Sequence, residues 1–327
     1  MKISLRRFIY LLLLGVCTAS LLVACNNVNN TRGTNYQPQT ENCRVVKHTM
    51  GETCIPRNPQ RVVTLRPDTF VNSWVLGIKP IGSADEIGAP LPQYLQGKVT
   101  QVQSVGSYDS PELEKILQLK PDLILSNSYM EAIYGQLSQI APTVVLDYPW
   151  PPLGWKKQLE ELAQVLGKED VSQQLMNDYS QRIEALKQAL GVGTASPKEN
   201  RRRTLKVSVA DITEDSRFTA YGEKHYSGTV LKDVGLQRPR SQTGDLFYIE
   251  NISEETIPDI DGDVLFLVPL DFDQTKLKNL KQKPLWQQLN VVQRNQVYLV
   301  GEHWHESDIL AINAIIDDLF NYLVNTP

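Results

Sequence analysis

The feature that most constrains this fold is a long amphipathic helix predicted near the middle of the chain. Apolar side chains recur there every three or four residues, at Val171, Leu175, Tyr179, Ile183, Leu186 and Leu190. This spacing places them in one stripe along an α-helix. Asp170 is a suitable N-cap and Gly191 a stop signal. We interpret the helix as a single crossover between two α/β lobes, although a packed helix inside one continuous domain is the alternative.

Short apolar runs alternate with helical patterns on both sides of this helix. Residues 110–128 begin with Ser-Pro, continue as an amphipathic helical segment, stop at Lys-Pro and end in an apolar strand. Residues 252–270 repeat the order of helix, stop and strand. Such alternation favours mainly parallel sheets with helices on both faces. We therefore predict an α/β protein with lobes at residues 43–168 and 192–327 and a connecting helix at residues 169–191.

The N-terminus has the pattern of a secretory signal. Basic residues precede an apolar stretch over residues 8–16, and the sequence LVAC then ends at Cys25. This ending matches the lipobox of bacterial lipoproteins, which predicts a signal peptide at residues 1–24 and acylation of Cys25. Residues 25–42 are polar and would form a flexible tether to the membrane. A plain signal peptide or an N-terminal membrane helix are the alternatives.

The four cysteines separate into groups by position. Cys17 would leave with the signal peptide, and Cys25 would carry lipid. Cys43 and Cys54 remain as an even pair in an exported protein, so a disulfide between them is expected. They flank a segment that reads as a β-hairpin with its turn near Met50 and Gly51, which could bring the two arms to bridging distance.

Charge and motifs disfavour two classes of function. The chain of 327 residues has a formal net charge of -4, which gives no reason to expect a nucleic-acid partner. It contains no G-x-S-x-G, H-E-x-x-H or phosphate-loop motif. We therefore expect a protein that is not an enzyme and that holds no resident cofactor.

Arginine and aromatic side chains follow several predicted strands of the first lobe. They include Arg66, Tyr108, Tyr129, Tyr148 and Trp150. The carboxyl ends of parallel strands meet at one edge of a sheet, and ligands of such sheets bind there. Each residue alone reads as a surface loop position, but together they predict a binding site.

The second lobe has two loops with similar chemistry. Arg217 and Tyr221 follow the first predicted strand, and Trp304 lies between His303 and His305 in a later loop. Arginine offers planar, charge-assisted hydrogen bonds, and Tyr and Trp offer broad apolar contacts with a polar edge. We interpret the histidines as polar loop residues near a ligand, with direct iron or haem ligation as the weaker alternative.

Several phrases together resemble a known family. They are the lipobox, GETCIPRNPQRVVTL, GIKPIGSA, SPELEKILQLKPDLILSNS, ISEETIPDIDGDVLFLV and NQVYLVGEHWHESDILAINAIIDDL. This set resembles the substrate-binding lipoproteins of iron-siderophore ABC importers, in the ferric-siderophore and cobalamin binding superfamily. The resemblance covers nearly all of the chain after Asn42. It implies two Rossmann-like lobes joined by one rigid helix, as in class III periplasmic binding proteins.

The resemblance also implies a ligand and partners. The ligand would be a ferric siderophore held between the lobes by Arg66, Arg217 and the aromatic residues, and an anionic hydroxamate or citrate-type chelate is favoured. Iron would enter only as part of this chelate. A haem- or cobalamin-binding protein on the same scaffold is the alternative. The family docks on ABC permease subunits, which work with their ATPase, through one glutamate from each lobe. The matching positions are Glu114 and Glu255, with Glu112 and Glu254 as close neighbours. The protein would be a monomer, anchored to the cell membrane by lipid alone and facing the periplasm or the cell exterior.

Overall fold

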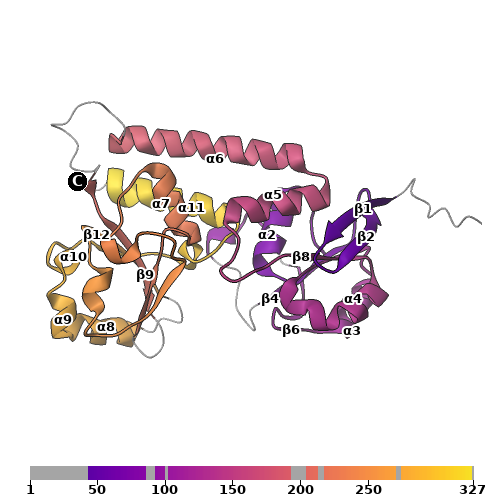
Figure 1. Cartoon of the computed structure of the whole chain (residues 1–327), viewed down its shortest axis with the longest axis horizontal. Helices are drawn as coiled ribbons and strands as arrows, with labels where there is room; N and C mark the ends of the chain where they lie inside the picture. Colours follow the sequence, from indigo (N-terminus) through magenta and orange to yellow (C-terminus); the bar gives the residue numbers. More distant parts are fainter. Residues whose placement is uncertain are drawn as a thin grey trace, which may run out of the picture. The chain divides into compact units, whose positions relative to one another are not determined.

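A computed structural model of the chain describes residues 43–85, 93–99, 102–192, 204–212, 217–269 and 274–325. Residues 44–327 form one compact unit. Within it, two sheets define two α/β lobes, and the long helix α6 joins them (Figure 1). The predicted signal peptide, the acylated Cys25 and the tether lie outside the described residues.

The N-terminal lobe is built on a six-stranded sheet of order β6-β5-β4-β3-β7-β8. Its strands are β3 (Val62–Thr64), β4 (Gly82–Asp85), β5 (Gln103–Ser107), β6 (Ser110–Pro111), β7 (Leu123–Asn127) and β8 (Thr143–Leu146). All neighbours are parallel except β5 and β6. The helices are α2 (Pro67–Val75), α3 (Leu113–Leu119), α4 (Tyr134–Ile140) and α5 (Trp155–Leu166), with 3-10 turns η2 (Gln93–Leu95) and η3 (Ser128–Ile133).

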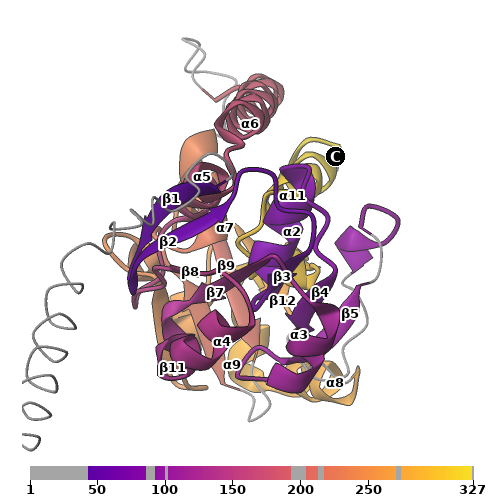
Figure 2. The same cartoon turned by 90° about the vertical axis from the view of Figure 1, so that its right-hand side faces the viewer.

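Both faces of this sheet are covered, as the sequence predicts. Figure 2 shows α2 and α5 on one side and α3 and α4 on the other. Successive strand residues point to opposite faces, so Val62 packs in the cluster that contains Leu159 of α5, whereas Val63 packs in the cluster that contains Ile116 of α3. A strand buried on both faces favours an apolar run, and β7 begins with one at Leu123, Ile124 and Leu125 before the buried Ser126 and Asn127.

The C-terminal lobe has a five-stranded sheet of order β11-β10-β9-β12-β13. Its strands are β9 (Val207–Ile212), β10 (Phe218–Tyr221), β11 (Tyr248–Ile252), β12 (Val264–Val268) and β13 (Val297–Leu299). Strands β9, β12 and β13 are parallel, and β10 runs antiparallel to β9 and β11. The helices are α7 (Tyr226–Val234), α8 (Gln274–Gln282), α9 (Pro284–Gln287), α10 (Asn290–Gln293) and α11 (Ile309–Leu319), which continues as the π-helical turn η8 (Phe320–Val324).

Strand β12 shows the same division between two faces. Phe266 packs in the cluster with α7 and α11, and Leu265 packs in the cluster with Trp286 of α9. The predicted helix before β12 is shorter than expected. A turn and the 3-10 helix η6 (Ile257–Ile260) stand there, because Pro258 falls inside the expected helix, where it removes a backbone donor and its ring clashes with the preceding turn. The other 3-10 turns are η5 (Arg240–Gln242) and η7 (Glu302–Trp304).

The connecting helix is confirmed as α6 (Glu169–Leu190), which lies along both lobes in Figure 1. Gly191 ends it in the left-handed conformation at φ 68°. The expected N-cap is wrong, because the helix begins at Glu169 and Asp170 lies in its first turn. Only the later part of the stripe, from Tyr179 to Leu190, is deeply buried, whereas Val171 is exposed. The domain boundaries predicted from the sequence stay predictions.

A β-hairpin precedes the first sheet. It consists of β1 (Cys43–His48) and β2 (Gly51–Pro56), with the turn at Thr49 and Met50. A disulfide joins Cys43 and Cys54, as predicted. Gly51 has φ 123°, a backbone conformation open to glycine and disfavoured for other residues.

Candidate functional site

A cavity of about 580 Å³ is lined by residues of both lobes. The N-terminal lobe supplies Arg66, Asp68, Phe70, Val71, Ser83, Tyr94, Tyr108, Tyr129, Tyr148 and Trp150, among others. The C-terminal lobe supplies Tyr226, Phe247, Tyr248, Glu302, His305, Glu306, Ser307 and Asp308. Most of the first group follows the carboxyl ends of parallel strands, which is where α/β sheets bind ligands, whereas Phe70 and Val71 lie in α2 and Tyr94 lies in η2.

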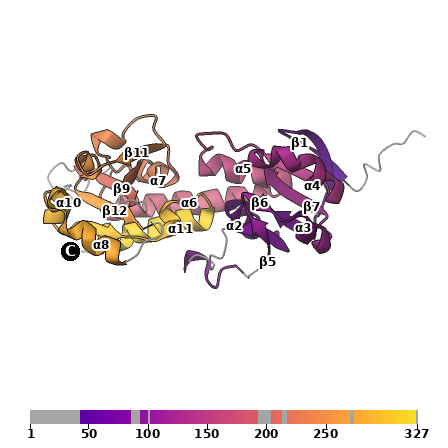
Figure 3. The same cartoon turned by 90° about the horizontal axis from the view of Figure 1, so that it is seen from below.

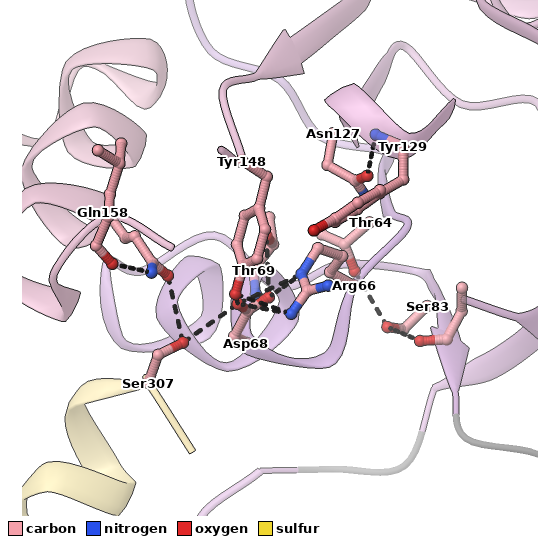
Figure 4. Close-up of polar contacts among 12 residues, drawn as sticks. Thr64, Arg66, Asp68, Thr69, Ser83, Asn127, Tyr129, Tyr148, Gln158 and Ser307 are labelled. Carbon is pink, nitrogen blue, oxygen red and sulfur yellow. Dashed lines mark hydrogen bonds and ion pairs between the residues drawn. The ribbon is translucent and has the colours of Figure 1, made fainter. Parts of the chain in front are cut away.

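Arg66 and Asp68 form the best-paired charges of the wall. Arg66 follows β3 at the N-cap position of α2, and Pro67 starts the helix. Arg66 Nε donates to Asp68 Oδ1 at 3.1 Å, and Arg66 Nη2 donates to Asp68 Oδ2 at 3.2 Å. Their side chains are 21% and 4% exposed. Figure 4 shows the carboxylate facing the guanidinium, with Tyr148 beside both.

The pairing keeps both groups charged despite their burial. Burial is the largest single effect on the pKa of Arg66 and lowers it, but the charge and hydrogen bond of Asp68 together with Tyr148 and Tyr226 outweigh burial, so the net pKa is raised. Burial likewise acts to raise the pKa of Asp68, and Arg66 reverses the shift, so the net pKa is lowered. The backbone N–H of Thr69 also donates to Asp68 Oδ1, at 2.7 Å. The pair is therefore a fixed dipole of zero net charge.

Tyr148 extends this network across the cavity base. Its hydroxyl accepts from Arg66 Nη2 at 2.9 Å and lies 3.3 Å from the hydroxyl of Tyr226. The guanidinium carbon of Arg66 also lies 4.0 Å from the centre of the Tyr148 ring. Ser307 Oγ can donate to Asp68 at 3.1 Å or to Gln158 at 3.2 Å. Polar groups from the two lobes therefore meet in the cavity wall, and Figure 4 shows their contacts.

The start of α11 forms a second polar contact between the lobes. Figure 3 shows it beside α2, and the backbone N–H of Ile309 donates to Asn72 Oδ1 at 3.1 Å. Asp308 caps α11 by accepting from two backbone N–H groups, and Tyr94 donates to its other oxygen at 2.6 Å. Burial raises the pKa of Asp308 to about 6. Burial lowers the pKa of His305 to about 4, so this ring is neutral at pH 7.

Three large aromatic side chains remain exposed at the cavity. Trp150 is 65% exposed, Tyr129 is 57% exposed and Tyr108 is 36% exposed. The Trp150 ring lies 6.1 Å from both Phe247 and Tyr248 of the other lobe, and Tyr129 lies 5.9 Å from Tyr148. Exposed rings that line a concave wall offer flat apolar contact with a hydrogen-bonding edge.

The structure brings together five of the eight predicted ligand-binding residues. Arg66, Tyr108, Tyr129, Tyr148 and Trp150 line the cavity. They come from different strands, but parallel pairing aligns the strand ends at one edge. Their common location was predictable because each follows a strand that local sequence identifies, whereas their role in binding a ligand stays a prediction.

The other three predicted residues do not line the cavity. Tyr221 and Trp304 are each 0% exposed, so their assignment to the cavity wall is corrected to the core. Trp304 stacks on Phe266 with ring centres 4.3 Å apart and donates to Asp318 at 2.8 Å. Arg217 lies on the surface and donates to Asn251 at 2.9 Å. Close packing from distant strands placed these side chains, which the loop pattern did not reveal.

The two histidines proposed as weak metal candidates separate in the structure. His305 lines the cavity. His303 is absent from its lining, and its Nε2 lies 2.9 Å from Asp318 Oδ2. Within the described residues, no group of three His, Cys, Asp or Glu side chains is placed to hold a metal ion. Direct metal ligation therefore gains no support from their positions.

Several cavity residues escaped the sequence analysis. Asp68 had a usable signal, because it stands two positions after Arg66 at the same strand end. Asp308 had one too, as an acid directly before an apolar helical run. Tyr94 and Tyr248 carry no comparable local signal, since they reach the wall through the arrangement of distant elements.

The predicted docking glutamates occupy exposed positions. Glu114 lies in the first turn of α3, and Glu255 lies in the turn before η6, where it accepts from Ser253 at 3.0 Å. Their neighbours are engaged in ion pairs, Glu112 with Lys115 and Glu254 with Lys283. Neither Glu114 nor Glu255 forms an ion pair with another described residue. Separately, every described helix is too short or too polar to cross a membrane.

Comparison with known proteins identifies the family. Residues 83–303 match the family described as periplasmic binding protein. The chain belongs to this family. Its members are substrate-binding proteins of transporters and do not form an enzyme family.

Individual relatives support the same grouping. This periplasmic binding protein is 32% identical to "Probable siderophore-binding lipoprotein YfiY" of Bacillus subtilis (strain 168), over 98% of this chain and 100% of that protein. It is 33% identical to the achromobactin-binding periplasmic protein of Dickeya dadantii (strain 3937), over 80% of this chain and 85% of that protein. The crystal structure of Staphylococcus aureus SirA complexed with staphyloferrin B is similar at TM-score 0.71 and 29% identity, covering 86% of this chain and 98% of that chain.

Proposed function

We propose that this periplasmic binding protein captures a ferric siderophore of the hydroxamate or citrate type in its cavity and delivers it to an ABC permease. The observation that carries the proposal is the cavity wall itself. It combines Arg66 with exposed aromatic rings, and both lobes contribute to it. A siderophore already occupies the coordination sphere of iron, so the wall needs hydrogen-bond donors and flat apolar surface rather than metal ligands. The names of relatives that bind siderophores support this choice.

A binding titration tests the proposal. The full chain in detergent is titrated with ferric hydroxamate, ferric citrate, ferric catecholate, haem and cobalamin while tryptophan fluorescence is followed. We expect saturable quenching by a ferric chelate at submicromolar concentration, because Trp150 lines the cavity. Trp150→Phe should remove most of the quenching but retain binding by calorimetry. Tight binding of haem or cobalamin alone would replace this function by the alternative one on the same scaffold.

We also propose that Glu114 and Glu255 dock the protein on the permease, which works with its ATPase. Both side chains are exposed and without an ion pair among the described residues, and exposed acids are suited to meet basic pockets on a partner. Glu114→Gln and Glu255→Gln should reduce uptake of radioactive ferric chelate by cells and leave binding unchanged. Glu112→Gln is the matched control. Equal uptake in all three variants would argue against this docking site.

The membrane anchor is proposed to be the acylated Cys25, which holds the protein, as a monomer, on the outer side of the cell membrane. The name of the lipoprotein relative YfiY supports this location. Cys25→Ala should release the protein from the membrane fraction, since no acyl chain could then be attached. Retention of the variant on washed membranes would contradict a lipid anchor at this residue.

A further inference from the structure

Five side chains close a ring of hydrogen bonds between the two lobes. The hydroxyl of Tyr148 lies 3.2 Å from Asp68 Oδ2 and 3.3 Å from the hydroxyl of Tyr226. Gln158 Nε2 donates to the Tyr226 hydroxyl at 3.3 Å. Ser307 Oγ lies 3.2 Å from Gln158 Oε1 and 3.1 Å from Asp68 Oδ2, and Figure 4 shows it between these two side chains. Because Tyr226 and Ser307 belong to the C-terminal lobe, four of the five contacts cross from one lobe to the other.

Gln158 of α5 differs from the other members of the ring in its position. Those four line the cavity, whereas Gln158 is not among the described residues of the lining. Its Nε2 also donates to the backbone carbonyl of Leu153 at 2.6 Å. A carbonyl oxygen can only accept, so the amide nitrogen must face Leu153 and the amide oxygen must face Ser307. The orientation of the Gln158 amide is therefore fixed by the backbone of its own lobe.

The ring has one proton fewer than it has contacts. Tyr148, Tyr226 and Ser307 each bring one hydroxyl proton, and Gln158 brings the N–H that is left after its bond to the backbone. Burial acts to raise the pKa of Asp68, but its partners lower the pKa overall, so Asp68 brings no proton. Donation toward the charged carboxylate is favoured. Tyr148 and Ser307 therefore donate to Asp68, Tyr226 donates to Tyr148, and the N–H of Gln158 keeps the Tyr226 oxygen paired.

The ring contains the two side chains that orient Arg66. Asp68 accepts from Nε and Nη2 of Arg66, and the Tyr148 hydroxyl accepts from Nη2. Nη1 of Arg66 forms no hydrogen bond with a residue that the structure describes, so it can donate to an oxygen of a bound molecule. A guanidinium is a rigid plane, so fixing two of its nitrogens also fixes the direction of the third. A change that loosens Asp68 or Tyr148 would therefore reorient this donor.

We infer that Gln158 is a positioning residue for ligand binding, which acts through this ring to fix the guanidinium of Arg66 in the cavity wall. The inference rests on the proposed function and adds to it a residue outside the cavity lining. Gln158 keeps Tyr226 and Ser307 of the C-terminal lobe in place, and their hydroxyls keep Asp68 and Tyr148 in place. Arg66 is then ordered before a ligand arrives, which lowers the entropic cost of binding.

The first test measures how firmly Arg66 is held in the ligand-free protein. Isotope-labelled arginine is introduced into the full chain in detergent, and Arg66→Lys identifies the side-chain NMR signal by its loss. The Nε–H of Arg66 should exchange slowly with water in the wild type, because it donates to a buried carboxylate. Gln158→Leu has a similar size but cannot join the ring, and it should speed this exchange about fivefold or more. Gln164→Leu, an exposed change on the same helix, is the matched control and should have no effect.

The second test measures affinity by calorimetry with ferrioxamine B and with ferric citrate. Gln158→Leu should weaken binding of the chelate that the wild type takes by about fivefold. Tyr148→Phe opens the same ring, so the double variant should bind no more weakly than the weaker of the two single variants. Independent structural effects would instead multiply. Ser307→Thr and Ser307→Val have the same shape, but only threonine keeps the hydroxyl, so the threonine variant should bind several-fold tighter.

The two tests separate the inference from the proposed function. Unchanged exchange at Arg66 in Gln158→Leu would overturn the inference, and so would faster exchange with unchanged affinity. Multiplied losses in the double variant, or equal affinities of the two Ser307 variants, would also overturn it. Failure of the wild type to bind either chelate would overturn the proposed function and the role of Gln158 in binding. A response of the Arg66 exchange to Gln158→Leu would in that case still support the action of the ring on Arg66.

Discussion

The N-terminal and C-terminal walls of the cavity differ in the elements that build them and in the side chains that they present. The N-terminal wall is made from the ends of parallel strands and presents a neutral Arg66–Asp68 pair beneath exposed rings. The C-terminal wall is made chiefly by the segment between β13 and α11, which is acidic and lies close to a helix start. The first wall therefore offers donors and stacking surface, and the second wall carries most of the acidic side chains.

The largest expected difference concerns two tryptophans. Trp304→Ala should destabilise the protein by about 3–5 kcal/mol, because a fully buried ring leaves a cavity behind. Trp150→Ala should change the free energy of unfolding by less than about 1 kcal/mol, because this ring is exposed. Urea unfolding followed by circular dichroism measures both values. Chelate affinity should fall more in Trp150→Ala than in Trp304→Ala, provided that the variant is folded. Equal losses of stability in the two variants would contradict the assignment of Trp304 to the core and Trp150 to the cavity surface.

Two arginines provide the next comparison. Arg66→Ala should cost about 3 kcal/mol, because it leaves Asp68 buried without its partner. Arg217→Ala should cost about 0.5 kcal/mol or less, because Arg217 lies on the surface. Thermal unfolding checks both values, and calorimetry should show weaker chelate binding for Arg66→Ala alone. A similar loss of affinity in Arg217→Ala would return this residue to the binding site.

The acid at the start of α11 should give the C-terminal wall a distinct pH response. The pKa of Asp308 is raised to about 6 in the folded protein, above its ordinary value near 4. Between these values the folded state binds more protons than the unfolded state, so this group adds stability as pH falls. Asp308→Asn keeps a good cap but no charge. We expect wild type to gain up to about 3 kcal/mol relative to Asp308→Asn between pH 7 and 4.

Denaturant unfolding of both proteins across this pH range measures the difference. Subtracting the two curves removes the contributions that they share, including that of His305. His305 acts in the opposite sense, because its pKa is lowered to about 4 and protonation of the unfolded state destabilises the fold between pH 6.5 and 4. Parallel pH curves for wild type and variant would show that Asp308 is not the responsible group.

The smallest expected effect concerns two tyrosine hydroxyls. Tyr94→Phe removes the hydrogen bond to Asp308 across the lobes and should cost about 1.5 kcal/mol, as is usual for bonds to charged groups. It should also raise the pKa of Asp308, because that hydrogen bond acts to lower it. Tyr129→Phe, on an exposed ring, should leave stability unchanged within about 0.5 kcal/mol. Thermal unfolding of both variants is sufficient to compare them.

Much of the N-terminal wall was predictable from short stretches of sequence. An apolar run identifies β7, and its helical neighbours imply that the strands are parallel. Parallel strands align their carboxyl ends, so Tyr129 after β7 and Tyr148 after β8 had to lie near one edge. The 3.6-residue period identified α6 in the same way, and a glycine identified its end. Local pattern failed at its start, where Lys168 occupies the N-cap position without a capping side chain.

The C-terminal wall depended on contacts between distant segments. Whether an aromatic residue in a loop is exposed or buried can be decided only when its neighbours in space are known. Trp304 is buried because Phe266 and the C-terminal helix cover it. Tyr94 and Asp308 meet across 214 positions of chain. Periodicity and turn chemistry are properties of residues that are close in sequence, so they can be predicted from the amino-acid sequence alone. Burial, ion pairing and the lining of a cavity arise when remote segments pack together, and these properties decide which side chains this site presents.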